Sequence, residues 1–580
     1  MRSPKYTLRI AALAVAAAGG GLAQITTDQK IGDFQSLAAL FAKQYAPYEW
    51  KRDALGFDLL KIGPWLDRVR ATRSDLDFYE VMLDYVASLN DAHSVYTVPS
   101  NFLATLNFTT DIYDGRVLID SINRTRLPAA LYPFQAGDEL VSVDGAPVEQ
   151  LIEQFLKYST SANPRSTRRN AAGRITSRPQ SRMPHAVDVA DEASVVIRRQ
   201  SGDLETYAIA WTKTGLPLTV VGPVLTPKPV NASAASSSER MSSERMSSEE
   251  MSSEEAPDYM AVLRQLQRCE IQAPLTILGL GARSPIFAPP AGFVQRLGRV
   301  QADFFYSGTF EAEGYKIGFS RIPSYSPPNA AAALQQFRTE IAYFQANTGG
   351  LVIDEMRNPG GSLSFLNSLT QLVIPYRYRT VGFQVRATSE WVVSVSRSLE
   401  NARAQNAPQW VQDLLGHIKS DMVTANSEMR GRTGSLPIDD VTLDRDPARG
   451  PNGELLAYTK PLVVLMDEMS ASGGDIFPAT LQDNGRGLLF GFRTMGAGGS
   501  VVTLAAGTYS EGVTGMTQTL IERKLPVVTA DYPAAPYIEN IGVRPDVELD
   551  YMTKENLLQN GRPFVNAFVQ AIVDQIRKAQ

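Results

Sequence analysis

Two serines and two glycines lie between an expected buried strand and an expected helix. The segment MSASGGDIFPATLQDNGRG covers residues 469–487 and follows the apolar run PLVVLMDE, which ends at Glu468. A helix N-terminus offers unpaired N–H groups and a partial positive charge, and both stabilise an oxyanion. The pattern therefore suits acyl transfer with Ser472 as the nucleophile. Serine is also a common helix N-cap, so a purely structural role for Ser470 or Ser472 is the alternative.

A serine nucleophile needs a base, and the chain contains three histidines. His93, in SLNDAHSVYT, follows a helical segment at an expected helix-to-strand junction and is the candidate base. His185 lies in an arginine-rich polar stretch, and His417 lies in the polar helical stretch PQWVQDLLGHIKS. We expect both of these side chains to be solvated. A structural histidine is the alternative interpretation of His93.

A second glycine turn, RNPGGS at residues 357–362, follows the buried strand expected in GLVIDEM. Glycine lets main-chain N–H groups approach a ligand closely, which is one way in which an oxyanion hole is completed. An ordinary turn at the end of a strand is the alternative.

Length and composition limit the classes of protein that need to be considered. A chain of 580 residues is long enough for about two to four domains. With 44% hydrophobic residues, 20% charged residues and a net charge of −5, it is typical of a globular protein and gives no electrostatic reason to bind nucleic acid. The histidines are too few and too scattered to suggest a metal or cofactor. The single cysteine, Cys269, excludes an intrachain disulfide.

The N-terminus has the layout of a secretory signal peptide. MRSPKYTLRIAALAVAAAGGGLAQ places three cations before an apolar run that is shorter than the about 20 residues of a membrane span. We expect residues 1–23 to be removed near Ala23, which predicts a secreted protein without a membrane anchor; an uncleaved N-terminal helix is the alternative. Sequons at Asn107, Asn123 and Asn231 fit a glycoprotein.

The N-terminal half divides into two regions and a linker. Residues 24–100 have helical periodicity and carry His93, and residues 101–225 read as a small module of short strands, turns and a helix. Within that module, the arginine-rich stretch at 159–186 is expected to be a mobile surface loop. Residues 226–290 form the expected linker, because the repeat SSERMSSERMSSEEMSSEE buries too little apolar surface to fold.

The C-terminal half alternates between apolar strands and helices. GYKIGFSRIP, GLVIDEM and KPLVVLMDE read as strands, and PNAAAALQQFRTEIAYFQAN reads as a helix with one apolar face. This alternation predicts an α/β core with a largely parallel sheet over residues 291–580.

Together these segments resemble the C-terminal-processing, or tail-specific, serine peptidases and the related core of tricorn protease. The matching pieces are DAHS, AGDELVSVDGAPVEQL, LVIDEMRNPGGS, PLVVLMDEMSASGGDIFPATLQDNGRGLLFGFRTMGAGGS and ENIGVRPDVEL, in the family's order. The resemblance implies a crotonase-like α/β core, a PDZ-like module at residues 101–225 and a peptide or protein substrate.

One departure from the bacterial pattern bears on the mechanism. Bacterial tail-specific members use a lysine twenty-five residues after the serine, and Ala497 stands there, in GAGG. This form resembles the branch that contains chlamydial protease-like activity factor and fungal relatives, whose triad is Ser, His and Glu. The resemblance implies Ser472 as nucleophile, His93 as base and Glu539, in YIENIGVRPD, as the orienting acid. Asp531 lies nearby and is the alternative acid.

The same resemblance implies the remaining features of the site and its use. The oxyanion hole would use the N–H groups of Gly473 and of Gly360 or Gly361. Relatives form homodimers and excise an internal inhibitory segment, which would fall here within residues 226–290. Some fungal relatives are encoded beside ribosomally made peptide toxins, so processing of a precursor peptide and general degradation of secreted protein are both expected roles. An inactive peptide-binding pseudo-peptidase is the alternative function.

Overall fold

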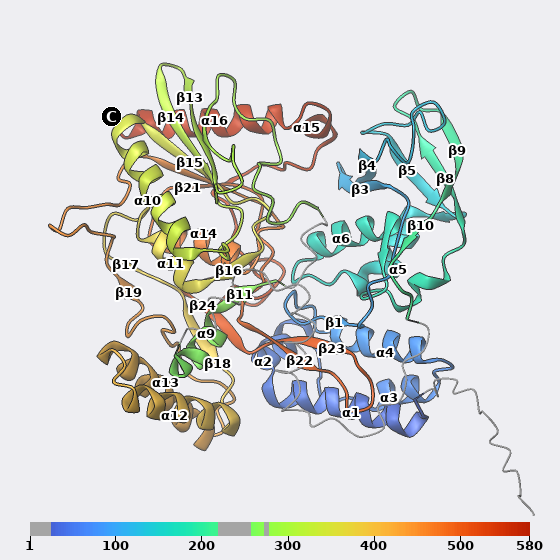
Figure 1. Cartoon of the computed structure of the whole chain (residues 1–580), viewed down its shortest axis with the longest axis horizontal. Helices are drawn as coiled ribbons and strands as arrows, with labels where there is room; N and C mark the ends of the chain where they lie inside the picture. The colour runs from blue at the N-terminus through green and yellow to red at the C-terminus, as the bar shows by residue number, and fades with distance from the viewer. Residues whose placement is uncertain (1–24, 219–256, 272–277) are drawn as a thin grey trace, which may run out of the picture.

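The computed structural model describes residues 25–218, 257–271 and 278–580, which form three units packed against one another (Figure 1). The N-terminal helices, in blue, lie beneath a module of strands and helices in cyan, and the α/β unit, from green to red, lies beside both. The predicted signal peptide at 1–23 and the repeat at 237–255 fall outside the described residues. No helix in the described ranges is both long and apolar enough to cross a membrane.

The predicted helical region at the N-terminus is confirmed as four helices. Thr26 and Ser74 each accept a hydrogen bond from the N–H three residues later and so cap the first and fourth helices. Gly56 ends the second in the left-handed conformation that favours glycine. The helices are α1 (Thr27–Gln44), α2 (Tyr48–Leu55), α3 (Gly63–Arg70) and α4 (Asp75–Ala87).

A short strand joins this helical region to the C-terminal part of the chain. β1 (Tyr96–Thr97) pairs antiparallel with β23 (Val513–Thr517), which forms a hairpin with β22 (Val501–Ala505). Met516 of the hairpin packs in the same apolar cluster as Phe34 of α1 and Tyr79 of α4. The N-terminal region therefore folds back onto the C-terminal half, as a base at His93 requires.

The module that follows is a strand-and-helix unit, as predicted. Its main sheet has the order β3-β4-β5-β8-β9, and the expected Asp-Gly turn follows β5. A smaller sheet has the order β10-β2-β7. The elements are β2 (Leu103–Thr105), β3 (Phe108–Tyr113), β4 (Arg116–Ile122), β5 (Glu139–Val143), β6 (Ala146–Pro147), α5 (Val148–Phe155), α6 (Pro164–Thr176), β7 (Ser177–Pro179), β8 (Glu192–Arg198), β9 (Leu204–Ala210) and β10 (Thr212–Thr214).

The arginine-rich stretch at 159–186 is not the predicted surface loop. It contains helix α6, which Asn163 caps and whose Ala171 and Ile175 are fully buried in the core of the module. Arg169 and Arg174, on the same helix, are buried as well. The prediction was wrong because the polar face of α6 is covered by other parts of the protein rather than by water.

The predicted α/β core is confirmed, with a seven-stranded sheet of order β12-β13-β14-β15-β20-β21-β26. The strands from β14 to β26 are parallel, and β12 and β13 are antiparallel additions at one edge. Alternate side chains of β15 point to opposite faces: Ile353 packs with α10 and α14, and Val352 packs with α16. The elements of this layer are β12 (Val294–Leu297), β13 (Tyr306–Ala312), β14 (Tyr315–Arg321), α10 (Ala330–Asn347), β15 (Gly350–Asp354), α11 (Leu363–Thr370), β20 (Leu462–Met466), α14 (Gly473–Asp483), β21 (Leu488–Gly491), β26 (Val547–Glu548) and α16 (Arg562–Lys578).

Smaller elements surround this layer. The strands β18, β24 and β25 form a separate antiparallel sheet, and β17 pairs with β19. Two long helices, α12 and α13, pack together at one end of the molecule (Figure 1). These elements are β17 (Tyr378–Arg379), β18 (Gly382–Val385), α12 (Ser389–Ala404), α13 (Gln409–Ser427), β19 (Asp444–Arg445), β24 (Thr519–Val527), β25 (Ala535–Tyr537) and α15 (Lys554–Leu558).

The linker predicted over 226–290 includes folded residues at its C-terminal end. Residues 257–271 form α9 (Ala261–Gln267) and β11 (Arg268–Glu270), and Leu263, Leu266 and Cys269 are fully buried in the core. β11 pairs antiparallel with β16 (Gly360–Ser362), the strand formed by the second glycine turn. The apolar residues of α9 and β11 follow the Ser/Glu repeat closely in sequence, so the change in composition did not mark where the linker ends.

Candidate active site

Ser472 lies at the turn between β20 and α14, directly before the first helical residue. Its backbone has φ of 59° and ψ of −108°, a region that a residue with a side chain rarely adopts. The Asp475 carboxylate holds this turn by accepting the Ser472 N–H at 2.7 Å. The strained turn lifts the serine side chain out of the strand direction and presents it beside the start of a helix.

His93 lies against this serine although 379 residues separate them in sequence. His93 Nε2 is 2.9 Å from Ser472 Oγ, and both residues are fully buried. Asp91 fixes the turn that carries the histidine, because its Oδ1 accepts the N–H groups of His93 and Ser94 at 2.8 and 3.1 Å. Of the three histidines, His93 is therefore the one that the fold places at the predicted nucleophile.

The surroundings of His93 favour its neutral form. Burial lowers the pKa of His93 to about 4, with the positive charge of Lys51 acting in the same direction and the negative charge of Asp91 opposing both. At neutral pH the imidazole can therefore accept the proton of Ser472. The other ring nitrogen, Nδ1, is buried and has no hydrogen-bond partner among the described residues.

Glu539 is close to this cluster and is paired with a buried lysine. Its Oε1 accepts a hydrogen bond from Lys51 Nζ, and its Oε2 accepts the Gly498 N–H at 2.8 Å. Glu539 and Lys51 are both fully buried. Burial raises the pKa of Glu539 to about 7; the negative charge of Asp91 adds to the rise, and Lys51 opposes it. No hydrogen bond joins Glu539 to His93 in the described residues.

The alternative acid, Asp531, lies at the surface. Its side chain is 60% exposed and is 3.5 Å from Arg544 and 3.8 Å from Arg493. Asp531 is thus part of a surface ion-pair cluster, and the structure places it with these arginines rather than with His93.

Asp91 and Lys51 are site residues that the sequence reasoning missed. Asp91 Oδ2 accepts hydrogen bonds from Tyr45 at 2.7 Å and from Thr517 at 2.8 Å. Lys51 Nζ also donates to Asn540 Oδ1 at 2.7 Å and to the Asn90 carbonyl at 2.9 Å. The position of Asp91 two residues before the histidine in DAHS was a usable signal for the aspartate. No local pattern marked the lysine.

The three predicted oxyanion-hole glycines are not equivalent. Gly473 is the first residue of α14, so its N–H has no partner within the helix. The Gly360 N–H donates to Asn358 Oδ1 at 2.9 Å and is therefore engaged. Gly361 lies in β16 opposite Cys269 of β11. Of the predicted donors, Gly473 is the one that follows Ser472 directly and whose N–H lies at the start of the helix.

Gly360 is needed for space beside the nucleophile. A Cβ at this position would lie 2.8 Å from Ser472 Cβ, 2.7 Å from the Gly473 nitrogen and 2.3 Å from the Cys269 carbonyl oxygen. Its φ of 101° also lies in the region that favours glycine. The glycine turn thus lets β11, β16 and the nucleophile turn pack in direct contact.

Ala497 lies in the GAGG segment, and its backbone supports the turn at Ser472. Asp475 accepts the N–H groups of Gly496 and Ala497, both at 2.9 Å, and the Thr494 hydroxyl. Burial raises the pKa of Asp475 to about 6, although these donors lower it. The GAGG segment is therefore fastened to the nucleophile turn by a carboxylate.

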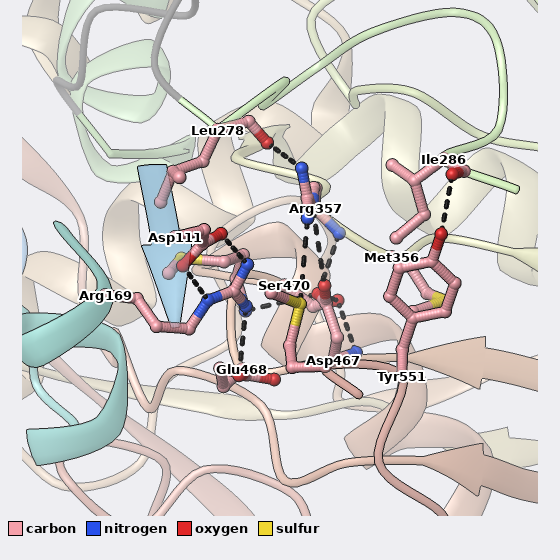
Figure 2. A network of polar contacts seen from close by, with 12 residues as sticks. Asp111, Arg169, Leu278, Ile286, Met356, Arg357, Asp467, Glu468, Ser470 and Tyr551 are labelled. Atoms are coloured by element: carbon pink, nitrogen blue, oxygen red, sulfur yellow. Dashed lines mark hydrogen bonds and ion pairs between the residues drawn. The ribbon is translucent and has the colours of Figure 1, made fainter. Parts of the chain in front are cut away.

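A second set of ion pairs holds the module against the segment that precedes the nucleophile. Figure 2 shows Arg169 of α6 between Asp111 of β3 and Glu468 of the core. The guanidinium contacts the two oxygens of Asp111 at 2.9 and 2.6 Å and Glu468 at 2.9 Å, and all three side chains are buried. Arg357 lies nearby, and its backbone N–H donates to Asp467 Oδ1 at 2.8 Å.

The other two histidines lie away from this site. His185 contacts Asp188 at 2.7 Å and Asp77 at 3.1 Å and is partly exposed, while His417 is exposed on α13. Within the described residues, no group of three or more histidine, cysteine or acidic side chains is arranged to hold a metal ion.

Comparison with known proteins agrees with this arrangement. Residues 316–549 match the model of peptidase family S41, and residues 103–217 match that of a PDZ domain. A protein of Chlamydia trachomatis is 26% identical over 90% of this chain and 89% of its own, and one of Chlamydia pneumoniae is 26% identical over 93% and 88%. A chloroplastic carboxyl-terminal-processing peptidase of Arabidopsis thaliana is 34% identical over 20% of this chain and 21% of its own.

A solved structure extends the likeness to the whole fold. The crystal structure of mature CPAF superimposes with a TM-score of 0.70 at 23% identity, and the match covers 95% of this chain and 98% of that one. The fold is therefore an S41 peptidase fold with a mixed α/β core, a helical N-terminal region and a PDZ domain.

Proposed function

We propose that this chain, a serine-type peptidase that carries a family S41 domain, hydrolyses internal peptide bonds through an acyl-enzyme on Ser472. The observation that carries the proposal is the 2.9 Å contact between His93 Nε2 and Ser472 Oγ in a buried site. This pairing of nucleophile and base is the geometry that acyl transfer requires.

The chemistry then follows from the residues at the site. His93 takes the proton of Ser472 as Oγ attacks the scissile carbonyl, and the Gly473 N–H at the start of α14 stabilises the oxyanion. His93 next gives that proton to the leaving amine, which frees the C-terminal product and leaves an ester on Ser472. Water, deprotonated by His93, attacks the ester and releases the N-terminal product with a free carboxylate.

We assign the third triad position to Glu539. The imidazolium formed during attack needs a nearby negative charge, and Glu539 is a buried carboxylate held in place by Lys51 and the Gly498 N–H. Asp91 is a second buried carboxylate whose charge acts on His93. Glu539→Gln and Asp91→Asn separate the two: the larger loss of kcat identifies the acid that stabilises the imidazolium.

We further propose that β11 belongs to an inhibitory segment within residues 226–290. β11 pairs with β16, whose Gly360 contacts the nucleophile, so it occupies a strand edge that an extended peptide would use. Chain cleavage between residues 219 and 256, followed by release of β11, would open this edge to substrate. Limited proteolysis before the activity assay tests this step.

For the cellular role we propose secretion and the substrates that the sequence predicts. The predicted signal peptide supports a secreted enzyme, and its peptide or protein substrates would be secreted proteins or the precursor of a ribosomally made peptide. The PDZ domain supports capture of extended peptide segments, because such domains add a strand to a sheet edge. A homodimer is the assembly that we expect, and size-exclusion chromatography with light scattering measures it.

Fluorophosphonate labelling tests the central proposal, because only an activated serine reacts quickly. The wild-type protein, before and after limited proteolysis, is compared with Ser472→Ala and His93→Ala. Labelling of wild type alone supports the proposal, and labelling of Ser472→Ala identifies a different nucleophile. If no form labels, the chain is a peptide-binding pseudo-peptidase, and the proposal fails.

A further inference from the structure

A small cavity lies where the helical region, the PDZ domain and the core meet, close to the residues that flank His93 and Ser472. Its volume is about 60 Å³, and Ala92 and Ser94, on either side of His93 in sequence, form part of its wall. Met495 lines it as well and packs in one apolar cluster with Ala471, the residue before the nucleophile. A water needs about 10–15 Å³ on this measure, so the cavity has room for a carboxylate group.

The wall of this cavity carries positive charge that no acidic residue in the wall balances. Lys157, Arg174 and Arg182 line the cavity, and the described lining contains no aspartate or glutamate. Lys157 and Arg182 each interact with other residues of the protein, and Lys157 Nζ is 2.8 Å from Glu80, outside the cavity. A buried cation without an anion is costly, so the environment of Arg174 needs an explanation.

Arg174, in the last turn of α6, is the residue at which the imbalance is sharpest. Its side chain is only 6% exposed, and its Nε and Nη1 atoms are buried without a hydrogen-bond partner among the described residues. Burial, together with the charge of Arg182, lowers the pKa of Arg174 to about 9, and no carboxylate of the described residues acts against this. Ser159 Oγ, also in the wall, is likewise buried and without a partner in the described part of the chain.

Arg169, on the same helix, is a buried arginine that has acidic partners. Its guanidinium contacts Asp111 through two hydrogen bonds and Glu468 through a third, and both acids are buried with it. Arg174 is buried to a similar degree, but it faces a cavity instead of a carboxylate. The difference indicates that the anion for Arg174 comes from outside the described part of the chain.

We propose that Arg174 and Ser159 bind a carboxylate of the peptide substrate in this cavity. The inference rests on the proposed peptidase function and adds the substrate class: peptides with an acidic side chain within a few residues of the scissile bond. A guanidinium and a hydroxyl together suit a carboxylate, because the guanidinium presents paired N–H donors and the hydroxyl adds a third.

Cleavage of matched peptides tests the proposal and distinguishes an acidic side chain from a free C-terminal carboxylate. One series replaces Glu by Gln at each position around the scissile bond, and the other replaces the C-terminal carboxylate by an amide. We expect kcat/KM of the activated wild-type enzyme to fall about 100-fold at one position of the Glu-to-Gln series. In Arg174→Met the same replacement should change kcat/KM less than about threefold. Equal rates for every Glu and Gln pair in wild type would overturn the proposal, whatever the amide series shows.

Arg168→Met is the matched control, because Arg168 lies on the same helix but pairs at the surface with Glu149 and Glu153. It should keep the wild-type preference for the acid. The midpoint of thermal unfolding should be unchanged or higher in Arg174→Met, since the variant removes a buried cation that has no partner. A lower midpoint would show that Arg174 is structural and would contradict the proposal.

Two readouts separate failure of this inference from failure of the proposed function. Fluorophosphonate labelling of Ser472 reports the function alone and should be the same in Arg174→Met as in wild type. Glutarate binding to Ser472→Ala, measured by calorimetry, reports the cavity alone and should be lost when Arg174→Met is added. If Ser472 labels but glutarate does not bind, the carboxylate site is refuted and the peptidase stands; the reverse result refutes the peptidase and keeps the site.

Discussion

Replacing Lys51 by methionine should destabilise the protein in a way that depends on pH. Lys51 is fully buried and is the cation that lies between Glu539 and the Asn540 side chain. Breaking a buried ion pair by removing one partner costs about 3–5 kcal/mol, because the remaining charge is left without compensation. In Lys51→Met that charge is Glu539, whose pKa is already raised to about 7 with the lysine present.

The sign of the pH dependence follows from the proton that Glu539 holds. Its pKa in the folded state lies above the ordinary value of 4.5, so the folded state binds a proton that the unfolded state has lost, and stability falls as pH rises through this window. In wild type this fall in stability ends at about pH 7, where Glu539 loses its proton in the folded state. In Lys51→Met the pKa of Glu539 rises further, so the stability of the variant continues to fall above pH 7. The deficit of the variant should therefore grow by about 1.4 kcal/mol for each pH unit above 7.

Urea unfolding of wild type and Lys51→Met at pH 6, 7 and 8 measures this deficit. Loss of the attraction between Lys51 and Asp91 adds to the stability deficit a contribution that is constant over this pH range. The same comparison in a Glu539→Gln background provides the control, because there the deficit should no longer change with pH. An equal deficit at pH 6 and pH 8 in the protein that retains Glu539 would refute the assignment of Lys51 as the charge partner of Glu539.

Three further outcomes are expected. The kcat/KM of wild type should rise with pH through an apparent pKa of about 7, because Glu539 must be ionised while the histidine base is already neutral. Initial rates from pH 5 to 9 should show this rise in wild type and its absence in Glu539→Gln. Arg169→Met should cost about 3–5 kcal/mol by leaving the buried Asp111 without its cation, while Glu468 keeps Arg165, and faster proteolysis between the PDZ domain and the core would report it. Gly360→Ala should abolish fluorophosphonate labelling, since its Cβ would lie 2.3 Å from a backbone oxygen of β11, whereas Gly416→Ala, whose Cβ meets no atom within 4 Å, should label normally.

The sequence predicted the core sheet and the turn at Ser472 because the signals for both are local, and the family resemblance then assigned Ser472 as the nucleophile. Residues 462–466 are an unbroken apolar run, and the glycines after Ser472 mark the turn into a helix. The structure confirms β20, α14 and the position of Ser472 between them. His93 was one of three candidate histidines and was assigned as the base through the family resemblance at DAHS, and the 2.9 Å contact with Ser472 supports that choice.

The errors concern residues whose environment comes from distant parts of the chain. α6 has the composition of a surface loop, and its arginines are buried only because Glu468, 299 residues from Arg169, meets the helix. Lys51 is likewise buried by Glu539, 488 residues away. A polar side chain is usually exposed, and its sequence neighbours do not show when a distant partner covers it. For the same reason the contacts of Glu539 with Lys51, rather than with His93, were not foreseen.

The pairing of β1 with β23 has a consequence for biosynthesis. The base enters near the start of the chain, the nucleophile follows at residue 472, and the strand that anchors the histidine segment ends at Thr517. Thr517 also donates a hydrogen bond to Asp91, which shapes the turn at His93. A ribosome must therefore complete most of the chain before the catalytic pair can assemble. Protein synthesis itself delays the appearance of activity, and truncated translation products lack it.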